Sequence, residues 1–305
     1  MFTVPDADRP YRAGFGCFMG RPNAGKSTLT NALVGEKVAI TSNRPQTTRR
    51  AIRGILTRPD AQLILVDTPG LHRPRTLLGE RLNDLVHQTW SEVDVIGLCI
   101  PANERIGPGD RFIAHDLAQL RATRVAVVTK TDLVDRGRLA EQLTAVSELA
   151  DFADVIPVSA TEGRQVELLA DVLIGHLPES PMLYPDDVTT DEPERVRIAE
   201  LVREAALEGV RDELPHSLAV LVEETSSETT RTGEPLTRIY ADVYVERPSQ
   251  KAIVIGRGGS RLRTVGAAAR AQIERLLGTK VYLELHVRVA KEWQRDPKQL
   301  RKLGF

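Results

Sequence analysis

The loop at residues 20–27, GRPNAGKS, constrains the fold of this 305-residue chain more than any other feature. It follows the pattern G-x-x-x-x-G-K-[ST], between an apolar run at residues 14–19 and a helical pattern at residues 26–34. A strand, a glycine-rich loop and a helix in this order form a phosphate-binding loop, because backbone N–H groups and the helix N-terminus face the anion. An ordinary glycine-rich turn is the alternative, and it leaves the flanking strand and helix unexplained.

Each residue type in this loop has a chemical task. Glycines let the backbone wrap around phosphates, Lys26 is expected to reach the β- and γ-phosphates, and Ser27 to bind Mg2+ through its hydroxyl. The predicted phosphate-contacting residues are Gly20, Arg21, Pro22, Asn23, Ala24, Gly25, Lys26, Ser27 and Thr28.

A second motif, Asp67-Thr-Pro-Gly70, follows the apolar run at residues 63–66. An Asp at the carboxyl end of a parallel strand, beside the phosphate-binding loop, can hold magnesium through water. Gly70 can offer its backbone N–H to the γ-phosphate. Many turns share this composition, so the spacing after the loop carries the prediction. The predicted contacts are Asp67, Thr68, Pro69 and Gly70.

A third motif, Thr129-Lys-Thr-Asp132, ends the apolar run at residues 125–128. The Asp132 carboxylate can accept both N1–H and the exocyclic N2–H of guanine, and adenine lacks that pair of donors. A backbone N–H in Ser159-Ala160 can meet guanine O6. As an isolated residue Asp132 would be an ordinary cap or turn residue, and the order of the motifs favours the base site. The predicted base contacts are Thr129, Lys130, Thr131, Asp132, Ser159 and Ala160.

The first half of the chain alternates apolar runs with helical patterns. This alternation predicts an α/β fold with a doubly wound, mostly parallel sheet covered on both faces. The predicted strands are residues 14–19, 50–56, 62–66, 93–100, 124–129 and 155–158, and the predicted helices are residues 26–34, 78–91, 110–120, 138–150 and 165–174.

The second half has a different character. Proline and acidic residues gather between residues 176 and 193, which indicates a boundary. We predict a nucleotide-binding domain at residues 1–180, a linker at 181–193 and a second domain at 194–305. In the second domain we expect helices at residues 194–212 and 260–277, strands at 217–223, 239–246 and 280–289, a loop at 225–236 and a short apolar run at 251–255.

The near-neutral total charge hides two unlike parts. The chain has 41 Lys plus Arg and 42 Asp plus Glu, a net charge of −1. Residues 236–305 hold 15 basic and 6 acidic side chains, and residues 186–235 hold 5 basic and 14 acidic ones. The asymmetry predicts a second domain with a basic face for a polyanion and an acidic face elsewhere. From charge alone, a merely solvated basic face is an equal alternative.

Composition excludes several classes of protein. The two cysteines, Cys17 and Cys99, lie in apolar runs, so they indicate core residues in a reducing, cytoplasmic setting and no disulfide framework. The N-terminus lacks the pattern of a signal peptide, and no run approaches the roughly 18 apolar residues that span a bilayer. Aromatic residues are 4% of the chain, which disfavours a platform of stacked aromatics.

The glycine cluster Gly256-Arg-Gly-Gly259 resembles the G-x-x-G signature of KH domains, which clamp single-stranded nucleic acid. Glycines let the loop approach a nucleic-acid backbone closely. A glycine turn between a strand and a helix is the alternative. The predicted RNA contacts are Lys251, Gly256, Arg257, Gly258, Gly259, Arg261 and Arg263.

Taken together, the ordered motifs resemble those of the translation-factor class of GTPases. Gln46-Thr-Thr-Arg49 and the C-terminal half narrow the resemblance to the Era family of ribosome-assembly GTPases, from about Gly14 to Phe305. The resemblance implies a P-loop NTPase domain followed by an α+β type II KH domain, and hydrolysis of GTP to GDP. It also implies that Thr48 contacts Mg2+ and that the catalytic set is Lys26, Thr48, Asp67 and Gly70. The implied metal ligands are Ser27, Thr48 and Asp67.

The resemblance further implies the partners. Family members bind the 3′ end of 16S rRNA and assist assembly of the 30S subunit in the cytoplasm. The closing segment, residues 293–305, either touches RNA or only packs as a helix. Peripheral membrane attachment is a further hypothesis, because the helix at residues 260–277 is basic and partly apolar. Its place directly after the glycine cluster favours RNA.

Three positions set expectations about the reaction. Thr129 stands where most relatives carry Asn, and we expect the shorter side chain to brace the phosphate-binding loop less, with Asp132 and Lys130 selecting guanine. Leu71 replaces the Gln that orients water in many GTPases, so we expect slow intrinsic hydrolysis. Asn23 matches related GTPases that use K+ at the phosphates, so potassium stimulation is a hypothesis.

Two rival functions stay open at this point. An RNA-modifying GTPase would carry a second catalytic constellation, and the scattered histidines and core cysteines supply none. A KH adaptor with a purely structural nucleotide site would bind GTP without releasing phosphate.

Overall fold

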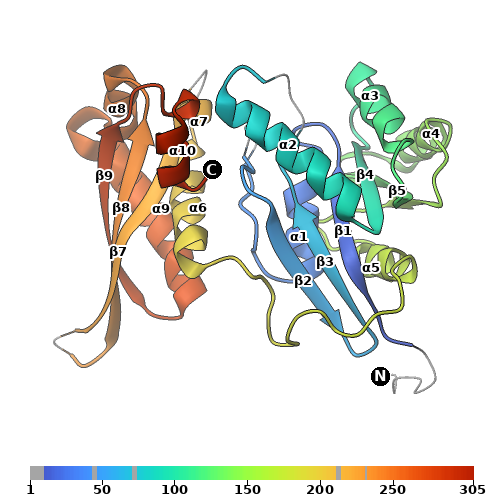
Figure 1. Cartoon of the computed structure of the whole chain (residues 1–305), viewed down its shortest axis with the longest axis horizontal. Helices are drawn as coiled ribbons and strands as arrows, with labels where there is room; N and C mark the ends of the chain where they lie inside the picture. The colour runs from blue at the N-terminus through green and yellow to red at the C-terminus, as the bar shows by residue number, and fades with distance from the viewer. Residues whose placement is uncertain (1–9, 43–46, 71–73, 211–213, 231) are drawn as a thin grey trace. The chain divides into compact units, whose positions relative to one another are not determined.

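The computed structural model describes residues 10–42, 47–70, 74–210, 214–230 and 232–305, which form two compact units. Most of the first unit lies before Glu192 and most of the second lies from Glu192 onward, and two short earlier stretches, around Thr47 and at residues 74–81, are assigned to the second unit. Each unit has its own sheet and its own apolar core (Figure 1).

The first unit is built on a six-stranded sheet in the order β2-β3-β1-β4-β5-β6. β2 runs antiparallel to β3, and the other neighbouring pairs are parallel. β3 and β4 are buried along their whole length, because both faces of the sheet are covered. The predicted mostly parallel sheet is confirmed. Its strands are β1 (Arg12–Met19), β2 (Ile52–Arg58), β3 (Ala61–Asp67), β4 (Val95–Pro101), β5 (Thr123–Thr129) and β6 (Asp154–Pro157).

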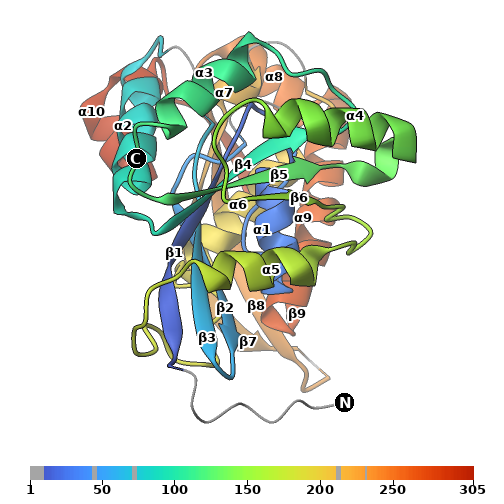
Figure 2. The ribbon, with the colours of Figure 1, turned by 90° about the vertical axis from the view of Figure 1, so that its right-hand side faces the viewer.

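Five helices flank this sheet in two layers (Figure 1, Figure 2). Side chains alternate between the faces of a strand, so Phe18 joins the core under α1 and α5, and Cys17 and Met19 join the core under α2, α3 and α4. The helices are α1 (Lys26–Val34), α2 (Leu77–Glu92), α3 (Pro108–Leu117), α4 (Arg136–Ser147) and α5 (Val166–Gly175), and a short 3-10 turn, η1 (Thr131–Leu133), follows β5.

The sheet brings the three predicted nucleotide motifs to one edge. In the register of the parallel strands, Cys17 of β1 pairs with Val66 of β3, and Pro101 of β4 pairs with Thr129 of β5. The strands β1, β3 and β5 therefore end near the same level. Ligands of open α/β sheets bind at the carboxyl ends of the strands, so this edge is the expected site.

The segment that links the two halves of the sequence packs onto the first unit. We call residues 177–191 the connecting segment. Its start pairs with β1, where Ala13 N donates to Pro178 O at 3.3 Å and Ser180 N to Tyr11 O at 3.0 Å. Further along, Ile55 N on the outer strand β2 donates to Thr189 O at 2.8 Å. The connecting segment is thus held by backbone hydrogen bonds at both ends.

A buried glutamine holds the middle of the connecting segment. Gln62 is fully buried in β3, and its Oε1 accepts from the backbone N of Leu183 and of Tyr184, each at 2.9 Å. Its Nε2 donates to Tyr184 O at 2.9 Å and to Thr57 Oγ1 at 3.0 Å. The predicted boundaries at residues 180 and 193 stay a proposal, and the structure adds that the predicted linker is bound to the first unit up to Asp191.

The second unit has a three-stranded sheet in the order β7-β8-β9, with β7 and β8 antiparallel and β8 and β9 parallel. One face of this sheet packs against α6 and α9 in a single apolar core. No helix among the described residues is long and apolar enough to cross a membrane. The elements are α6 (Glu194–Leu207), α7 (Leu214–Ser217), β7 (Ala219–Thr229), β8 (Pro235–Val245), α8 (Pro248–Ile255), η2 (Arg257–Gly259), α9 (Ser260–Leu277), β9 (Lys280–Val289), η3 (Trp293–Arg295) and α10 (Pro297–Leu303).

One expectation about the second unit was wrong. Most of the predicted loop at residues 225–236 is strand, because β7 and β8 form a long hairpin in which Ser and Thr backbones pair and Arg238 bonds Glu228 at 3.0 Å. The short apolar run at residues 251–255, for which the sequence predicted neither a strand nor a helix, belongs to helix α8. Pro248 begins that helix and Gln250 Oε1 accepts from two backbone N–H groups before it, which is a helix start that the apolar pattern did not reveal.

The C-terminal segment packs on the second unit. Trp293 is fully buried, its Nε1 donates to Ser217 O at 2.9 Å, and its ring stacks on Phe305 at 5.7 Å between centroids. Lys302 Nζ donates to Tyr244 Oη at 3.0 Å. Of the two expectations for this segment, packing as a helix is thus observed, and contact with RNA stays a prediction.

Candidate nucleotide-binding and RNA-binding sites

The phosphate-binding loop has a backbone that only certain residues tolerate. Gly20, Asn23 and Gly25 have φ values of 148°, 63° and 94°, in the left-handed half of the map. A Cβ added at Gly20 would lie 2.6 Å from the carbonyl oxygen of Cys99, so any side chain there would collide with β4. This curled backbone leads directly into α1, whose N-terminus adds partial positive charge.

Lys26 is the half-buried cation of this loop. Its Nζ donates to Gly20 O and Arg21 O, each at 2.9 Å, so the ammonium group lies within the curl of the backbone. Burial lowers the pKa of Lys26 from its ordinary value. A polyphosphate would supply the negative charge that this ammonium group needs. A Cβ at Gly70 would lie 3.8 Å from Lys26 Nζ, which places the second motif beside the first.

Three oxygen-bearing side chains from three motifs meet beside the loop. Ser27 Oγ donates to Asp67 Oδ2 at 2.7 Å, Thr48 Oγ1 donates to the same oxygen at 3.1 Å, and the two hydroxyl oxygens are 3.2 Å apart. Asp67 is 2% exposed, and its Oδ1 is buried without a hydrogen-bond partner among the described residues. Hydroxyl and carboxylate oxygens are the ligands that Mg2+ prefers, so this cluster fits the metal.

The environment of Asp67 opposes its charge. Burial raises the pKa of Asp67 above its ordinary value, and the hydrogen bond from Ser27, the nearby Lys26 ammonium and the hydrogen bond from Thr48 act in the opposite direction. A bound divalent cation would relieve this cost, because it would neutralise a carboxylate that water does not reach.

The base-binding motif follows β5 in a distinctive turn. Lys130 has a φ of 57°, and the backbone then turns through η1, which contains Asp132. Ser159 Oγ donates to Asp132 Oδ1 at 2.6 Å. The hydrogen bond joins the two predicted base-contacting loops and orients the carboxylate on which guanine recognition would depend.

Thr129 contacts the phosphate-binding loop directly. Its hydroxyl donates to Ala24 O at 2.7 Å and is buried, so it braces the phosphate-binding loop from the neighbouring strand end. Thr129 thus contributes to bracing the loop, and the expectation that it does so less than Asn stays a prediction. Two other predicted features, Gln46 and Leu71, lie outside the described residues.

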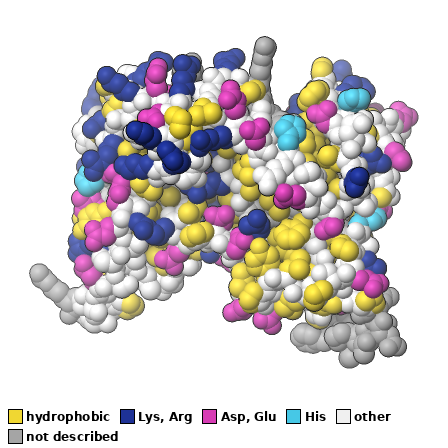
Figure 3. Space-filling model, viewed as in Figure 1, with side chains coloured by type: hydrophobic (Ala, Val, Ile, Leu, Met, Phe, Trp, Pro, Cys, Tyr) yellow, Lys and Arg dark blue, Asp and Glu magenta, His cyan; other side chains and the backbone are white. Residues whose placement is uncertain are grey.

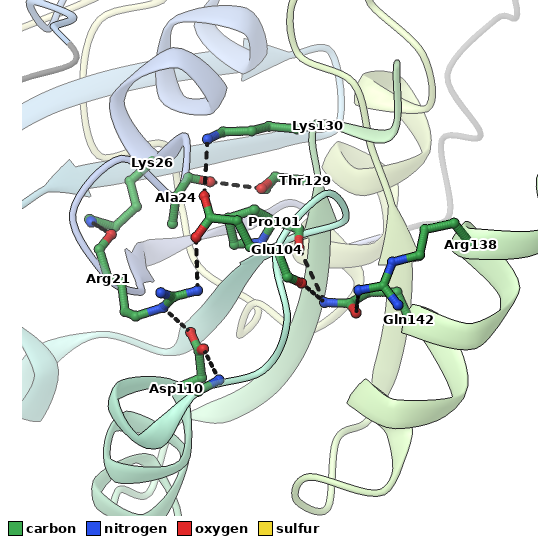
Figure 4. A network of polar contacts seen from close by, with 11 residues as sticks. Arg21, Ala24, Lys26, Pro101, Glu104, Asp110, Thr129, Lys130, Arg138 and Gln142 are labelled. Atoms are coloured by element: carbon green, nitrogen blue, oxygen red, sulfur yellow. Dashed lines mark hydrogen bonds and ion pairs between the residues drawn. The ribbon is translucent and has the colours of Figure 1, made fainter. Parts of the chain in front are cut away.

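Motif reasoning missed two acidic residues at this edge. Glu104 and Asp110 both hydrogen-bond Arg21 of the phosphate-binding loop, and Figure 4 shows them between that loop, Lys130 and α3. Neither residue belongs to a recognisable motif. Both lie in the stretch after β4, and only the sheet order places that stretch beside β1.

The glycine cluster of the second unit joins two helices, α8 and α9. Gly256, Gly258 and Gly259 have φ values of 73°, 57° and 77°. A Cβ at Gly256 would lie 2.7 Å from Arg261 Cβ, so the loop needs glycine there for its own geometry as well as for approach to a ligand. The turn is therefore helix–loop–helix, and the alternative of a turn between strand and helix does not apply.

The predicted RNA-contacting cations differ in their surroundings. Arg257 and Arg263 are exposed and Lys251 is half-buried. Arg261 Nη2 donates to Ala206 O at 3.1 Å and Glu208 O at 2.7 Å, which caps the end of α6. Lys and Arg side chains gather over the second unit in the space-filling view (Figure 3). Arg261 therefore has a structural task, and its contact with RNA stays a prediction.

Comparison with known proteins identifies the family. One family model, described as a 50S ribosome-binding GTPase, matches residues 16–130, and a KH domain model matches residues 213–294. The GTPase Era of Streptomyces coelicolor is 67% identical over 306 residues, covering 98% of this chain and 96% of the relative. The GTPase Era of Mycolicibacterium smegmatis is 65% identical, covering 97% and 99%. The chain belongs to the Era family of GTPases.

Two solved structures of Era proteins match nearly the whole chain. Aquifex aeolicus Era bound to GDP and AlF4− matches with a TM-score of 0.90, and Era in complex with MgGDPNP and nucleotides 1506–1542 of 16S ribosomal RNA matches with 0.88. Both are 34% identical to this chain and cover 96% of it and 99% of their own length. The predicted fold class, a P-loop GTPase domain followed by a KH domain, is confirmed, and so is GTPase activity.

Proposed function

We propose that this Era-family protein uses the residues described above as a GTP-dependent switch that binds the 3′ end of 16S rRNA and assists assembly of the 30S subunit in the cytoplasm. The observation that carries the proposal is the convergence of Ser27, Thr48 and Asp67 on one point beside Lys26, in a chain that also has a glycine clamp. The Era complex with MgGDPNP and 16S rRNA nucleotides supports the pairing of the two ligands.

In the proposed reaction the protein positions GTP and water, and bound Mg2+ supplies positive charge at the phosphates. Lys26 holds the β- and γ-phosphates inside the curled loop, and backbone N–H groups of the loop bind the remaining oxygens. Ser27 and Thr48 offer hydroxyl oxygens, and Asp67 holds the hydration shell. Loss of the γ-phosphate removes the partner of Gly70 and Thr48, which lets the loops that contain them change conformation.

Guanine selection is assigned to Asp132. Its carboxylate is held by Ser159 Oγ at 2.6 Å, which leaves it oriented to accept N1–H and N2–H of the base. Thr129 braces the phosphate-binding loop, so the base site and the phosphate site are built on adjoining strand ends. An adenine ring has an unprotonated N1 and no amino group at C2, so it offers no N–H donor where the carboxylate accepts two.

The potassium hypothesis concerns Asn23, which lies at the exposed crest of the phosphate-binding loop. A monovalent cation there would add positive charge where negative charge develops on the phosphates in the transition state. GTP turnover is expected to be faster in potassium than in sodium buffer at equal ionic strength. Equal turnover in the two buffers would remove the hypothesis.

RNA binding is assigned to the loop between α8 and α9, with Lys251, Arg257 and Arg263 as phosphate contacts. The exposed guanidinium groups and the N-terminus of α9 offer donors to a single strand that the glycines let approach. Membrane attachment through α9 remains a prediction of the sequence alone, because Val265, Ala269 and Ile273 on the apolar face of that helix lie in the core.

The deciding experiment is crosslinking in cells with protein held in the GTP state, followed by sequencing of the bound RNA. The proposal expects fragments from the 3′ end of 16S rRNA, and random messenger RNA fragments would refute it. Phosphate release measured with and without 30S subunits separates a working GTPase switch from an adaptor with a structural nucleotide site, since the adaptor would release none.

A further inference from the structure

Glu104 lies between two cations that belong to different parts of the nucleotide site. Its Oε2 accepts from Arg21 Nη2 at 3.0 Å, and its Oε1 is 3.9 Å from Lys130 Nζ (Figure 4). Arg21 belongs to the phosphate-binding loop and Lys130 to the base-binding loop. A single carboxylate therefore joins the two loops that would hold opposite ends of one nucleotide.

The backbone that carries Glu104 is held firmly. Gln142 of α4 is 3% exposed, and its Nε2 donates to Pro101 O at 3.1 Å and to Glu104 O at 3.0 Å. Ala102 N donates to Thr129 O at 2.8 Å, which ties the same turn to the end of β5. The carboxylate of Glu104 thus starts from a fixed point and does not swing freely in solvent.

Arg21 has a second anchor below Glu104. Its Nε donates to Asp110 Oδ1 at 2.8 Å, and Asp110 is 1% exposed. Asp110 Oδ2 accepts from Gly107 N at 2.8 Å at the start of α3. A Cβ at Gly109 would lie 3.1 Å from Arg21 Cδ, so the stem of Arg21 lies closely over that helix turn. The guanidinium group is consequently fixed in position to meet Glu104.

The carboxylate of Glu104 offsets the repulsion between the Arg21 and Lys130 cations. Without a carboxylate between them, two cations on adjoining loops would repel each other and favour an open site. With Glu104 between them, its carboxylate attracts Arg21 on one loop and Lys130 on the other, so the two loops are held close together. Because Arg21, Lys130 and Glu104 are only partly exposed, salt screens these interactions less than those of freely exposed pairs.

We propose that Glu104 is a positioning residue that couples the phosphate-binding loop to the base-binding loop through Arg21 and Lys130. The inference rests on the proposed nucleotide site. It adds a link between the two loops through a residue that belongs to none of the nucleotide motifs. Its consequence is slow nucleotide dissociation, since a nucleotide leaves only when both loops release it. Glu104 touches no reacting atom in this account, so hydrolysis of bound GTP does not depend on it.

The test substitutes Glu104→Gln, which keeps the shape of the side chain and removes its charge. Dissociation of a fluorescent GDP analogue and of a non-hydrolysable GTP analogue is expected to accelerate about 3- to 10-fold, or about 0.7–1.4 kcal/mol. Single-turnover hydrolysis at saturating GTP is expected to stay within about 2-fold, and thermal unfolding without nucleotide to stay unchanged. Unchanged dissociation, or slowed hydrolysis with unchanged dissociation, would overturn the proposal.

A matched control and a double-mutant cycle sharpen the result. Glu167 lies on α5, and its exposed carboxylate forms an ion pair with Arg58 at 2.6 Å. Glu167→Gln removes this carboxylate and is expected to leave nucleotide dissociation unchanged. In the cycle, Arg21→Gln and Glu104→Gln together are expected to accelerate dissociation no more than the stronger single variant, because they break one network. If the accelerations of the two single variants multiply in the double variant, the two residues act independently and the coupling is refuted.

Asp132→Asn separates this inference from the site on which it rests. An amide at that position is expected to shift preference from guanine to xanthine nucleotides, since xanthine carries an oxygen where guanine has N2–H. If Asp132→Asn shifts preference while Glu104→Gln changes nothing, only the coupling is wrong. If Asp132→Asn retains full preference for guanine, the base site itself is misplaced.

Discussion

At the scale of single residues, the site is made of groups that are unfavourable in the folded protein until a ligand arrives. Lys26 is half-buried and Asp67 is buried, and desolvation shifts the pKa of each toward its neutral form. A buried charge without full compensation costs stability, so such residues are kept for binding. Thr129 is different, because its hydroxyl is satisfied by Ala24 O and supports the loop before any ligand binds.

The substitution Asp67→Asn tests this cost. The folded-state pKa of Asp67 is raised by burial, so the folded state binds that proton more tightly and stability falls as pH rises through the range above the unfolded value. At neutral pH, Asp67→Asn is therefore expected to raise Tm in the absence of nucleotide and Mg2+, and to abolish Mg2+-dependent GTP hydrolysis. Calorimetry at pH 5 and pH 7 checks the sign, and Asp171→Asn on exposed α5 is the control.

At the scale of elements, the loop between α8 and α9 depends on backbone conformations that side chains alone do not predict. The helix–loop–helix of the second unit has three glycines at positive φ, and space is open around Gly258. The loop is thus shaped by glycine while its surface stays accessible to a ligand.

Gly258→Asp is expected to weaken RNA binding at least 10-fold, because a carboxylate would face the RNA phosphates. Gly278→Asp is the matched control. Gly278 follows the end of α9, the helix that begins just after the glycine cluster. It has a φ of 65° and also has no neighbour within 4 Å, so both substitutions carry a similar backbone cost. Electrophoretic mobility or fluorescence anisotropy with a single-stranded 16S rRNA fragment measures the difference. Equal loss in both variants would indicate a folding effect.

The connecting segment depends on the hydrogen bonds that Gln62 makes with it. In Gln62→Leu, the backbone N of Leu183 and both backbone groups of Tyr184 would lose their partners. Because two of those groups lie beside a fully buried side chain, unfolding free energy is expected to fall by about 2–3 kcal/mol. Denaturant titration gives the magnitude, and limited proteolysis should cut near residue 184. Gln88→Leu on the exposed side of α2 is expected to change neither.

At the scale of the whole molecule, a net charge of −1 conceals a basic half-domain that would dominate behaviour toward RNA. Electrostatic binding releases counterions, so the logarithm of RNA affinity should fall linearly with the logarithm of salt concentration, by about 0.7 for each phosphate contact on a single strand. With Lys251, Arg257 and Arg263 engaged, a slope near −2 is expected. Arg263→Gln should reduce the slope by about 0.7, and a salt-insensitive affinity would contradict the assignment.

The local pattern of the chain was sufficient for the P-loop, the sheet and most helices. Strand–loop–helix order around residues 20–27 and continuous apolar runs depend on short-range periodicity, which is visible in the sequence. The hairpin β7–β8 was mispredicted and helix α8 was not predicted, in each case for a physical reason. Polar residues become strand when a partner strand supplies hydrogen bonds, and a short apolar run is compatible with either period.

By itself, then, the sequence determined which chemistry this protein has, because each nucleotide motif carries its functional groups within a few residues. Tertiary structure alone decided how the motifs are joined. Glu104 reaches Arg21 across 83 residues and Gln62 reaches Tyr184 across 122. Those contacts depend on strand order and on buried polar groups finding partners, and neither is encoded in local spacing.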